Sequence, residues 1–254
     1  MNIGAQLYTV RAAMQTQEDI ALTLRRIADI GYQYVQLSGH KPMDPMWMKA
    51  ELDRNGLRCV LTHTAPDRLV SDFDAVAQEH DLLDCRYVGL GGYAFHTPDH
   101  SENTFDEYVG TYAPVAKAMK ERGKLFMHHN HAREFIHEDG VPIIQKLAEA
   151  FPPDEMGFTL DTYWVQRGGG NPAEWLDRLK GRVPCIHLKD YGYLPEDKCA
   201  FAVLGEGNLN FDAIFAAAER AGTEYMLVEQ DDCYGEDPFD CLRRSYEYLR
   251  SFGF

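Results

Sequence analysis

Imidazole and carboxylate side chains gather at a few points of this sequence, each directly after a short apolar run. Mixed nitrogen and oxygen ligands suit Mn²⁺, Zn²⁺, Co²⁺ or Mg²⁺, unlike the thiolate-rich sites of structural zinc. The same groups can take up or release protons. The pattern predicts a divalent metal site with acid–base groups around it. The residues are His63, His128, His129, His131, Glu134, Asp161, His187, Lys189, Asp190, Glu229, Asp231 and Asp232.

Each of these residues also has a purely structural interpretation. Asp161 could cap a following helix, and His187 could be a hydrogen-bonded core histidine. Glu229 could pair with Lys189, and the histidines of 128–131 could form a polar loop. Position favours a shared site, because an Asp, a His and a Glu end three consecutive predicted strands. Burying these groups together costs free energy unless a cation or a substrate compensates.

The elements that must position these side chains are eight short apolar runs, each typical of a buried strand. Amphipathic segments with helix signals lie between them. The predicted strands are Ile3–Tyr8, Tyr34–Leu37, Leu57–Thr62, Tyr87–Leu90, Lys124–His129, Met156–Asp161, Val183–Leu188 and Tyr225–Glu229.

Helix starts are marked by capping residues. Thr16 precedes a face formed by Ile20, Leu24 and Ile27, and Gly31 stands just past its end. Three helices are predicted to begin at an N-cap followed by proline, and two at capping-box spacing. The expected caps are Asp44, Ser71 (with Asp74), Thr104 (with Glu107), Asn171, Asn210 and Asp237.

Strand–helix alternation repeated eight times in 254 residues predicts a single (β/α)₈ TIM barrel domain over residues 1–254. A doubly wound open sheet is the competing fold. It requires a glycine-rich turn after the first strand, and the sequence there, Tyr8–Ala12, contains no glycine. In a barrel the active site lies at the carboxyl ends of the strands.

The net charge and the cysteine spacing indicate which partners and which cellular compartment to expect. The net charge is −15, from 25 basic and 40 acidic residues, which disfavours nucleic acid and anionic membranes as partners. The six cysteines have no C-x-x-C spacing and read as free thiols of a reducing compartment. Neither a signal peptide nor an apolar run of about 18 residues is present, so a cytoplasmic location is expected. The sequence is compatible with a homo-oligomer without fixing its size.

Taken together, several motifs resemble one family over essentially the whole chain. The sequence is similar to the sugar isomerase/epimerase family with a xylose-isomerase-like TIM barrel, in the AP endonuclease 2-like superfamily. The motifs are Gln6–Arg11, Ile30–Leu37, His128–Phe135, Leu160–Trp164, His187–Asp190, Gly205–Phe211 and Val228–Gln230.

The resemblance implies one divalent metal ion held by a Glu, an Asp, a His and a second Glu. Asp161, His187 and Glu229 match the last three places. The first place is a strand-end Glu in many relatives, whereas this chain has histidines there and Glu134 beyond them. Either Glu134 reaches back to the metal or His129 replaces it, and we favour Glu134. The departure also leaves open whether one of the family's two glutamate bases has become a histidine.

The chemistry implied by such a site starts from a keto-sugar or a related polyol. A metal that chelates the carbonyl and its neighbouring hydroxyl acidifies the adjacent C–H, and proton removal gives an enediolate. Reprotonation on the other carbon isomerises the substrate, reprotonation on the other face epimerises it, and loss of a β-leaving group makes the enzyme a dehydratase or lyase. The predicted catalytic residues are Glu229, Glu134, His129 and Lys189, with His131 or His63 as further proton carriers.

Substrate contacts are expected from side chains near the same strand ends. Lys189 points to the same side as His187 and could stabilise an oxyanion or form an ion pair with Asp161 or Glu229. The run Gly205–Gly207 is interpreted as a tight turn, because Glu206 disfavours an anion, and the substrate is expected to be unphosphorylated. The predicted substrate-binding residues are His63, His131, Tyr8 and Trp164.

Two functions of other classes compete with a sugar isomerase or epimerase. An apurinic-site endonuclease uses the same barrel but needs more than one metal and a basic DNA-binding face, which the net charge of −15 disfavours. A non-catalytic sugar-binding barrel would be favoured by incomplete metal ligands, and three of the four are in place. The sequence leaves open the substrate, the metal, and the choice between isomerisation, epimerisation and elimination.

Overall fold

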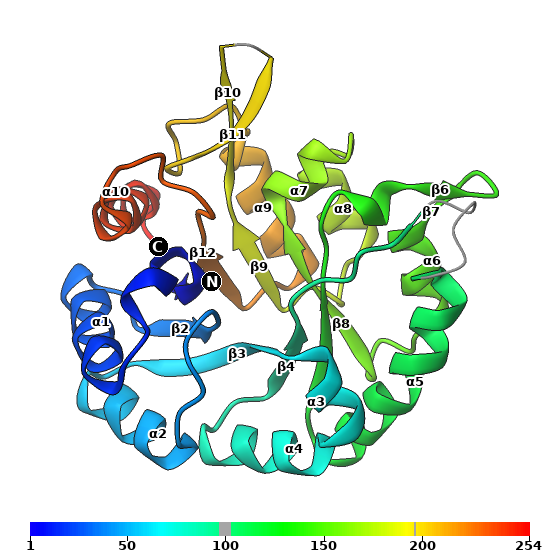
Figure 1. Ribbon diagram of the computed structural model, residues 1–254. Helices are drawn as coiled ribbons and strands as arrows, with labels where there is room; N and C mark the ends of the chain where they lie inside the picture. The colour runs from blue at the N-terminus through cyan, green and yellow to red at the C-terminus, as the bar shows by residue number, and fades with distance from the viewer. Residues whose placement is uncertain (97–102, 196) are drawn as a thin grey trace.

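The fold is a closed barrel of eight parallel strands in the order β1-β12-β9-β8-β5-β4-β3-β2, as Figure 1 shows. The computed structural model describes residues 1–96, 103–195 and 197–254. All eight predicted strands are confirmed, with ends shifted by at most a few residues. They are β1 (Asn2–Gln6), β2 (Tyr34–Leu37), β3 (Arg58–Thr64), β4 (Tyr87–Leu90), β5 (Leu125–His129), β8 (Met156–Asp161), β9 (Cys185–Leu188) and β12 (Tyr225–Val228).

Helices surround the barrel in an outer ring (Figure 1). Within the described ranges, none is long and apolar enough to cross a bilayer. The helices are α1 (Gln17–Ile30), α2 (Pro45–Arg54), α3 (Pro66–Ser71), α4 (Phe73–Leu82), α5 (Phe105–Glu121), α6 (Ile143–Ala150), α7 (Thr162–Arg167), α8 (Pro172–Arg178), α9 (Phe211–Ala221) and α10 (Pro238–Ser251).

The capping residues account for most helix starts. Thr16 accepts a hydrogen bond from the Asp19 backbone N–H, and the Thr104 and Glu107 side chains form a reciprocal capping box. The prediction at Ser71 is wrong. Pro66 starts a short helix earlier, so Ser71 becomes its last residue and donates its hydroxyl to the Asp67 carbonyl instead.

Three local features interrupt the simple alternation of strands and helices. Strand β1 stops at Gln6, two residues before the predicted end, because the Gln6 side chain accepts the Tyr8 N–H and starts a 3₁₀ helix. A second 3₁₀ turn follows β5. Two antiparallel hairpins were not predicted, and one of them projects above the barrel (Figure 1). These elements are η1 (Leu7–Ala13), η2 (Arg133–Phe135), β6 (His137–Glu138), β7 (Val141–Pro142), β10 (Asp190–Leu194) and β11 (Lys198–Ala202).

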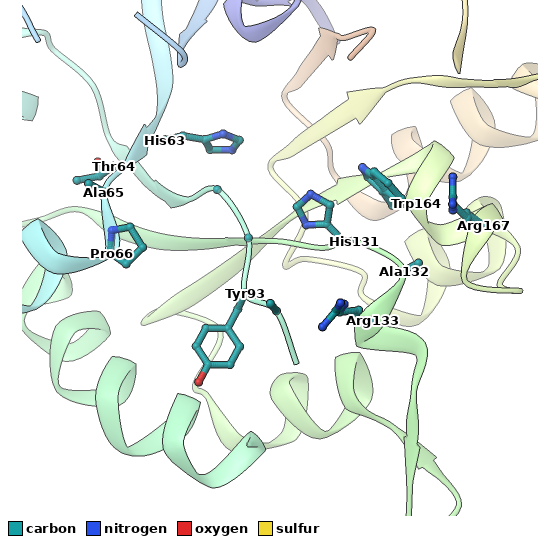
Figure 2. A pocket seen from close by; sticks show the side chains of 13 residues that line it. His63, Thr64, Ala65, Pro66, Tyr93, His131, Ala132, Arg133, Trp164 and Arg167 are labelled. Carbon is teal, nitrogen blue, oxygen red and sulfur yellow. The ribbon is translucent and has the colours of Figure 1, made fainter. Parts of the chain in front are cut away.

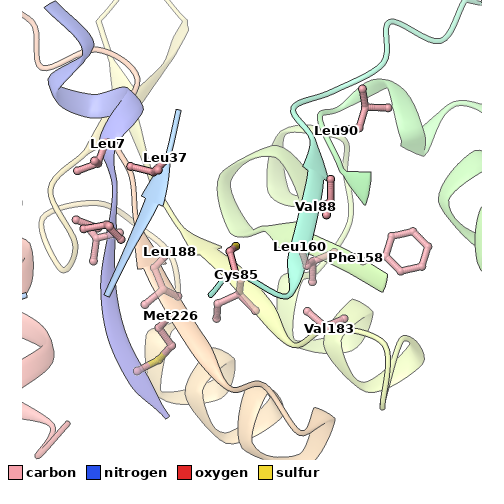
Figure 3. Close-up of a cluster of buried hydrophobic side chains, with 14 of the residues drawn as sticks. Leu7, Leu37, Cys85, Val88, Leu90, Phe158, Leu160, Val183, Leu188 and Met226 are labelled. Carbon is pink, nitrogen blue, oxygen red and sulfur yellow. The ribbon is translucent and has the colours of Figure 1, made fainter. Parts of the chain in front are cut away.

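Two apolar clusters separate the outside of the barrel from its inside. The larger one lies between strands and helices and includes Val88, Phe158 and Leu188 (Figure 3). The smaller one contains residues that face the barrel interior, at alternate positions of the strands except for the adjacent Val60 and Leu61, where the pairing of β2 and β3 is irregular. Because side chains alternate along a strand, the residues two positions further on reach the interior at the carboxyl end. The smaller cluster is Val60, Leu61, Tyr87, Leu125, Met127, Cys185 and Leu227.

Candidate active site

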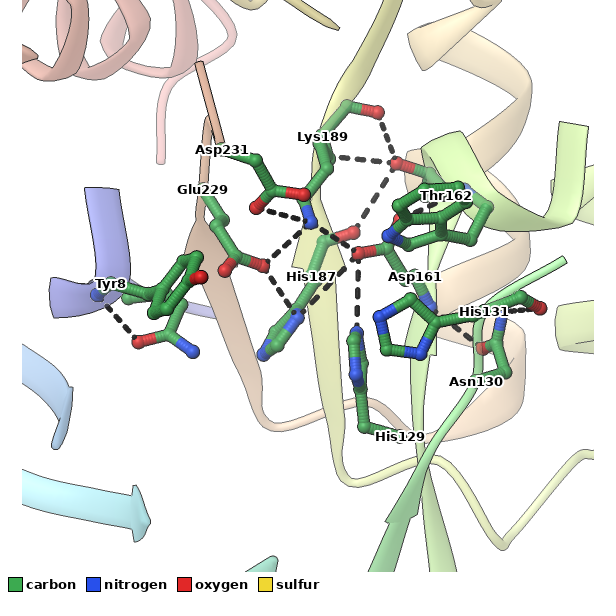
Figure 4. Close-up of polar contacts among 12 residues, drawn as sticks. Tyr8, His129, Asn130, His131, Asp161, Thr162, His187, Lys189, Glu229 and Asp231 are labelled. Carbon is green, nitrogen blue, oxygen red and sulfur yellow. Dashed lines mark hydrogen bonds and ion pairs between the residues drawn. The ribbon is translucent and has the colours of Figure 1, made fainter. Parts of the chain in front are cut away.

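Four buried side chains converge at the carboxyl-end mouth of the barrel. Their ligand atoms, two imidazole nitrogens and two carboxylate oxygens, all lie within 4.8 Å of one another. Three of them stand two positions after an inward-facing apolar residue, at Met127, Cys185 and Leu227. Strand alternation therefore carries these side chains to one point. The group is His129, Asp161, His187 and Glu229 (Figure 4).

His187 is oriented by a partner on the opposite part of the barrel. Its Nε2 lies 2.6 Å from Gln36 Oε1, so that nitrogen carries the hydrogen and donates it. The other nitrogen, Nδ1, lies 2.9 Å from Glu229 Oε2. Burial lowers the pKa of His187, but the charges of Glu229 and Asp161 raise it overall, so without an ion Nδ1 carries a proton that faces Glu229. A cation bound between these two atoms would take the place of that proton.

His129 repeats the same arrangement on β5. Its Nδ1 donates to the carbonyl of Gly91 at 2.9 Å, which leaves the Nε2 lone pair facing Asp161 Oδ2 at 3.3 Å. A histidine that donates its outer N–H and turns its other nitrogen inward is the usual state of a metal ligand. Burial lowers the pKa of His129, and a proton on the neighbouring His187 lowers it further, which favours the neutral form of His129 that can ligate.

Asp161 serves the fold and the site at once. Its Oδ1 accepts the Trp164 N–H at 3.0 Å and caps α7, and the Asn130 side chain accepts the Asp161 N–H at 2.9 Å. Its Oδ2 faces the group of four. The helix-cap interpretation and the shared-site interpretation of Asp161 are therefore both correct for different oxygens of one carboxylate.

Lys189 closes one side of the group as a buried ammonium. Its Nζ lies 3.0 Å from Asp161 Oδ2, 2.9 Å from Glu229 Oε2 and 3.0 Å from Asp231 Oδ1. Burial opposes its charge, yet the three carboxylates raise the Lys189 pKa. Burial likewise opposes ionisation of Asp161 and Glu229, but Lys189 lowers both pKa values well below their usual range. Burial, then the Glu229 charge, raises the pKa of Asp231 to about 6.

The donor set fits a divalent cation. Asp161 and Glu229 supply two negative charges, and His129 and His187 can supply two neutral nitrogens, so a doubly charged ion would balance the group. Lys189 and Asp231 balance each other beside it. Two imidazoles with two carboxylates and no thiolate suit Zn²⁺, Mn²⁺ or Co²⁺.

Glu134 lies outside this group, and here the structure departs from the ligand favoured by the sequence. The side chain is buried, and its two oxygens accept hydrogen bonds from His128 Nε2 at 3.1 Å and from the His131 backbone N–H at 2.9 Å. His128 in turn is bonded to the Tyr108 hydroxyl at 2.8 Å. Glu134 thus holds the turn after β5, and His129 stands where a strand-end glutamate was expected.

A cavity of about 830 Å³ opens beside the group of four, and Figure 2 shows the side chains that line it. Three predicted substrate-binding residues are among them, namely His63, His131 and Trp164. The ring of His131 lies 4.8 Å from that of His129 and 5.0 Å from that of Trp164, so the cavity adjoins the group of four. Tyr8 does not line this cavity; it lies on η1, where Arg11 covers its ring.

The two cavity histidines offer different hydrogen-bonding groups. His63 Nδ1 accepts from Gln6 Nε2 at 3.4 Å and from the Ser38 hydroxyl at 3.2 Å, so its buried Nε2 carries a hydrogen that has no partner among the described residues. Burial, then the charge of His129, lowers the pKa of both His63 and His131, the latter to about 4. Both are therefore neutral at pH 7.

Three polar groups that orient the site were missed from the sequence, namely Gln36, the Gly91 carbonyl and Asn130. Alternation offered a signal for the first, because Gln36 shares its face of β2 with Tyr34, which packs against the interior cluster. The role of the Gly91 carbonyl has no sequence signal, since every residue has a backbone carbonyl.

The fold and the matched sequence place the chain in a family. Residues 24–252 match the model of the xylose isomerase-like TIM barrel, and the chain belongs to that family.

Individual relatives are more distant. The chain is 23% identical to an inosose dehydratase of Geobacillus kaustophilus, over 92% of this chain and 86% of that protein. A sugar phosphate isomerase/epimerase from Parabacteroides distasonis superposes with a TM-score of 0.80 at 20% identity, covering 98% of this chain and 93% of the other. An L-ribulose 3-epimerase gives a TM-score of 0.75 at 17% identity, covering 99% and 94%. At these identities the structural likenesses establish the fold alone.

Proposed function

We propose that this protein is a divalent-metal-dependent enzyme that removes the proton beside the carbonyl of a polyhydroxylated ketone and isomerises or epimerises it through an enediolate. The substrate class is a keto-sugar or a related polyol such as a keto-inositol. The proposal extends to this chain the sugar and inosose chemistry that the names of its relatives state.

One observation carries the proposal. His129 and His187 each donate their outer N–H to a neutral acceptor, Gly91 or Gln36, and turn the other ring nitrogen towards a carboxylate. Such an arrangement is stable when a cation sits between the acceptors. Bound there, a divalent ion would act as a Lewis acid on the carbonyl and hydroxyl oxygens of the substrate.

The side chains around the cavity supply the remaining functions. The His63 Nε2–H is a donor aimed at no protein acceptor among the described residues, and it is suited to bind a substrate oxygen. Trp164 offers an apolar face for the C–H groups of a sugar. Lys189 is a buried cation and would stabilise negative charge that develops on a substrate oxygen.

We assign the proton transfers to Glu229 and His131. Glu229 belongs to the group of four and is ionised, because Lys189 and His187 hold its pKa down against the effect of burial. His131 lines the cavity, is neutral at pH 7, and makes no side-chain hydrogen bond within the described part of the chain. Two such groups near one carbon could exchange its proton on different sides. Glu134 has no part in this step, since both its oxygens are engaged.

Elimination of water is a second candidate outcome of the same first step. The curated relatives from Geobacillus and Bacillus species are named inosose dehydratases and are 22–24% identical to this chain. An enediolate with a β-hydroxyl can lose that group instead of regaining a proton. The two outcomes share the metal, the carbonyl and the first base, and they differ only in the product.

Solvent exchange tests the shared first step. Incubation in D₂O with Mn²⁺, free ketoses and keto-inositols should place deuterium beside the carbonyl, and EDTA should stop the exchange. Glu229→Gln should slow it about 10²–10⁴-fold, whereas Glu121→Gln, on the exposed side of α5, should not.

The products then separate the candidates: a new ketose or aldose supports isomerisation or epimerisation, and a dehydrated ketone supports elimination. Conversion without any exchange, or exchange that persists in EDTA, would contradict the proposal. Cleavage of a duplex with an abasic site would instead favour the endonuclease alternative.

A further inference from the structure

The cavity wall differs in charge from the rest of this acidic chain. Thirteen of the described residues line it, and these thirteen include two arginines, Arg133 and Arg167, but no aspartate or glutamate. The chain as a whole has 40 acidic and 25 basic residues. The carboxylates of the neighbouring group, Asp161 and Glu229, are paired with Lys189. The described lining of the cavity therefore carries positive side chains and no negative ones.

Both arginines have donor groups to spare. Arg133, on η2, donates one N–H to the Phe95 carbonyl at 3.3 Å. Arg167, at the end of α7, donates one to the Tyr163 hydroxyl at 2.9 Å. Within the described ranges, no carboxylate oxygen lies within 4 Å of either guanidinium. A guanidinium has five N–H donors, so most of them remain available to a ligand.

Each arginine is also held near the cavity by its surroundings. The Arg167 guanidinium lies 5.4 Å from the centre of the Trp164 ring, a cation–π arrangement that places it along the cavity wall. Arg133 lies in the turn that Glu134 ties to His131 through a 2.9 Å hydrogen bond. Figure 2 shows Arg133 near His131 and Arg167 next to Trp164, on the far side of that ring from His131.

Arg133 and Arg167 are the arginine and lysine side chains among the described residues that line the cavity. Planar guanidinium groups bind carboxylate and phosphate through paired, charge-assisted hydrogen bonds.

We infer that the substrate carries an anionic group, a carboxylate or a phosphate, at the end away from its reacting carbonyl, and that Arg133 and Arg167 bind that group. The inference rests on the proposed function, since it assumes that the carbonyl end lies at the group of four. It departs from the unphosphorylated sugar expected from the sequence.

That expectation relied on a different segment of the chain. Gly205 and Gly207 donate their N–H groups to Asp190 at 3.0 Å each, so the segment is a tight turn as predicted and lies outside the cavity wall. Its composition therefore says nothing about what the cavity binds.

Binding to the metal-free protein tests the inference independently of catalysis. Calorimetric titrations would compare D-fructose and D-tagatose with their 6-phosphates and with the matching ketohexuronates, which have a carboxylate at C6. At least one charged series should bind about tenfold or more tightly than its neutral parent, and added salt should weaken that difference. The tighter series identifies the group as phosphate or carboxylate.

Single substitutions then locate the binding groups. Arg133→Gln and Arg167→Gln should each weaken binding of the charged ligand about tenfold and leave the neutral parent within twofold. Arg178→Gln is the matched control, because Arg178 also covers a tryptophan, Trp175, but lies outside the cavity. Equal affinity for charged and neutral ligands, no binding of either charged series, or no effect of the two cavity substitutions would overturn the inference.

The outcomes separate the two proposals. Arginine-dependent binding without metal-dependent solvent exchange would leave the anion site standing and refute the proposed reaction. Metal-dependent exchange of neutral ketoses that neither arginine substitution affects would support the proposed reaction and refute the anion site.

Discussion

Gln36 on β2 and His187 on β9 meet inside the barrel through a hydrogen bond of 2.6 Å between Oε1 and Nε2. Two other strands separate them in the sheet, so the contact crosses the interior. It gives Nε2 a hydrogen and turns Nδ1 towards Glu229, where this nitrogen would ligate the proposed ion. A residue outside the group of four thus orients one of its members.

Replacing Gln36 should weaken metal binding without removing a ligand. Gln36→Met keeps a side chain of similar volume but removes the hydrogen-bond acceptor for His187. The affinity for Mn²⁺ or Zn²⁺ should then fall about 10–100-fold. Competition with a chromogenic chelator would measure it, with Gln33→Met, an exposed neighbour, as control. Unchanged affinity in Gln36→Met would mean that the hydrogen bond does not orient the ligand.

The strand-5 ligand can be identified by a matched pair of substitutions. His129→Ala should lower the metal content of purified protein measured by elemental analysis, because it removes one of four donors. Glu134→Gln should keep the metal but lower the free energy of unfolding by about 1–3 kcal/mol, since it weakens the acceptors of His128 and the His131 N–H. The opposite pattern would restore Glu134 as the ligand favoured from the sequence.

Metal binding should stabilise the folded protein. An ion that binds only the folded chain adds about 2.7 kcal/mol to the free energy of unfolding when its concentration is about 100 times the dissociation constant. Urea unfolding with and without Mn²⁺ would measure the gain. His187→Ala should lose most of it, and a gain equal to that of the unsubstituted protein would place the bound ion elsewhere.

Acid should destabilise the protein partly through His80, a buried residue of α4. Burial lowers the pKa of His80 to about 4, although the 2.7 Å hydrogen bond to the Val76 carbonyl acts in the opposite direction, and the Thr62 hydroxyl lies 2.8 Å from the other ring nitrogen. Between pH 6.5 and 4 the unfolded chain binds a proton that the folded chain does not. This contribution is complete above pH 6.5 and is lost as pH falls towards 4, by ~3 kcal/mol.

Unfolding free energies at pH 7.5, 6 and 5 would isolate this contribution. His80→Gln should be less stable at pH 7.5 but should have a shallower loss with acid than the unsubstituted protein. His137→Gln, at an exposed position, should keep the full slope. Parallel slopes in all three proteins would assign the acid sensitivity to other groups.

The barrel strands were predictable because each is a short apolar run buried on both faces, bounded by capped helices. Gly31, at φ 121°, ends α1 where its position past the apolar face predicted. The β10–β11 hairpin was not predictable in the same way. Its tip includes the exposed residues Tyr193 and Leu194, so no buried alternation marks it as a strand.

The convergence of Asp161, His187 and Glu229 was predictable, because they end their strands or follow them directly. Strand alternation also predicts that His129, and not Glu134, lies with them. Met127 faces the interior, so His129, two positions later, faces it as well and His128 faces the helices. Glu134 lies beyond the strand, in the 3₁₀ turn η2, so strand alternation does not predict where its side chain points.

The cavity wall and the group of four draw on partly different stretches of the chain. The wall comes from segments that follow β3, β4, β5 and β8, whereas the group also needs β9 and the end of β12. Residues 92–94 and 132–133 touch the cavity and contribute no side chain to the group, whereas Gly91 must stay because its carbonyl accepts the His129 N–H. Exchanging residues 92–94 and 132–133 would therefore reshape the cavity and keep all four side chains of the group.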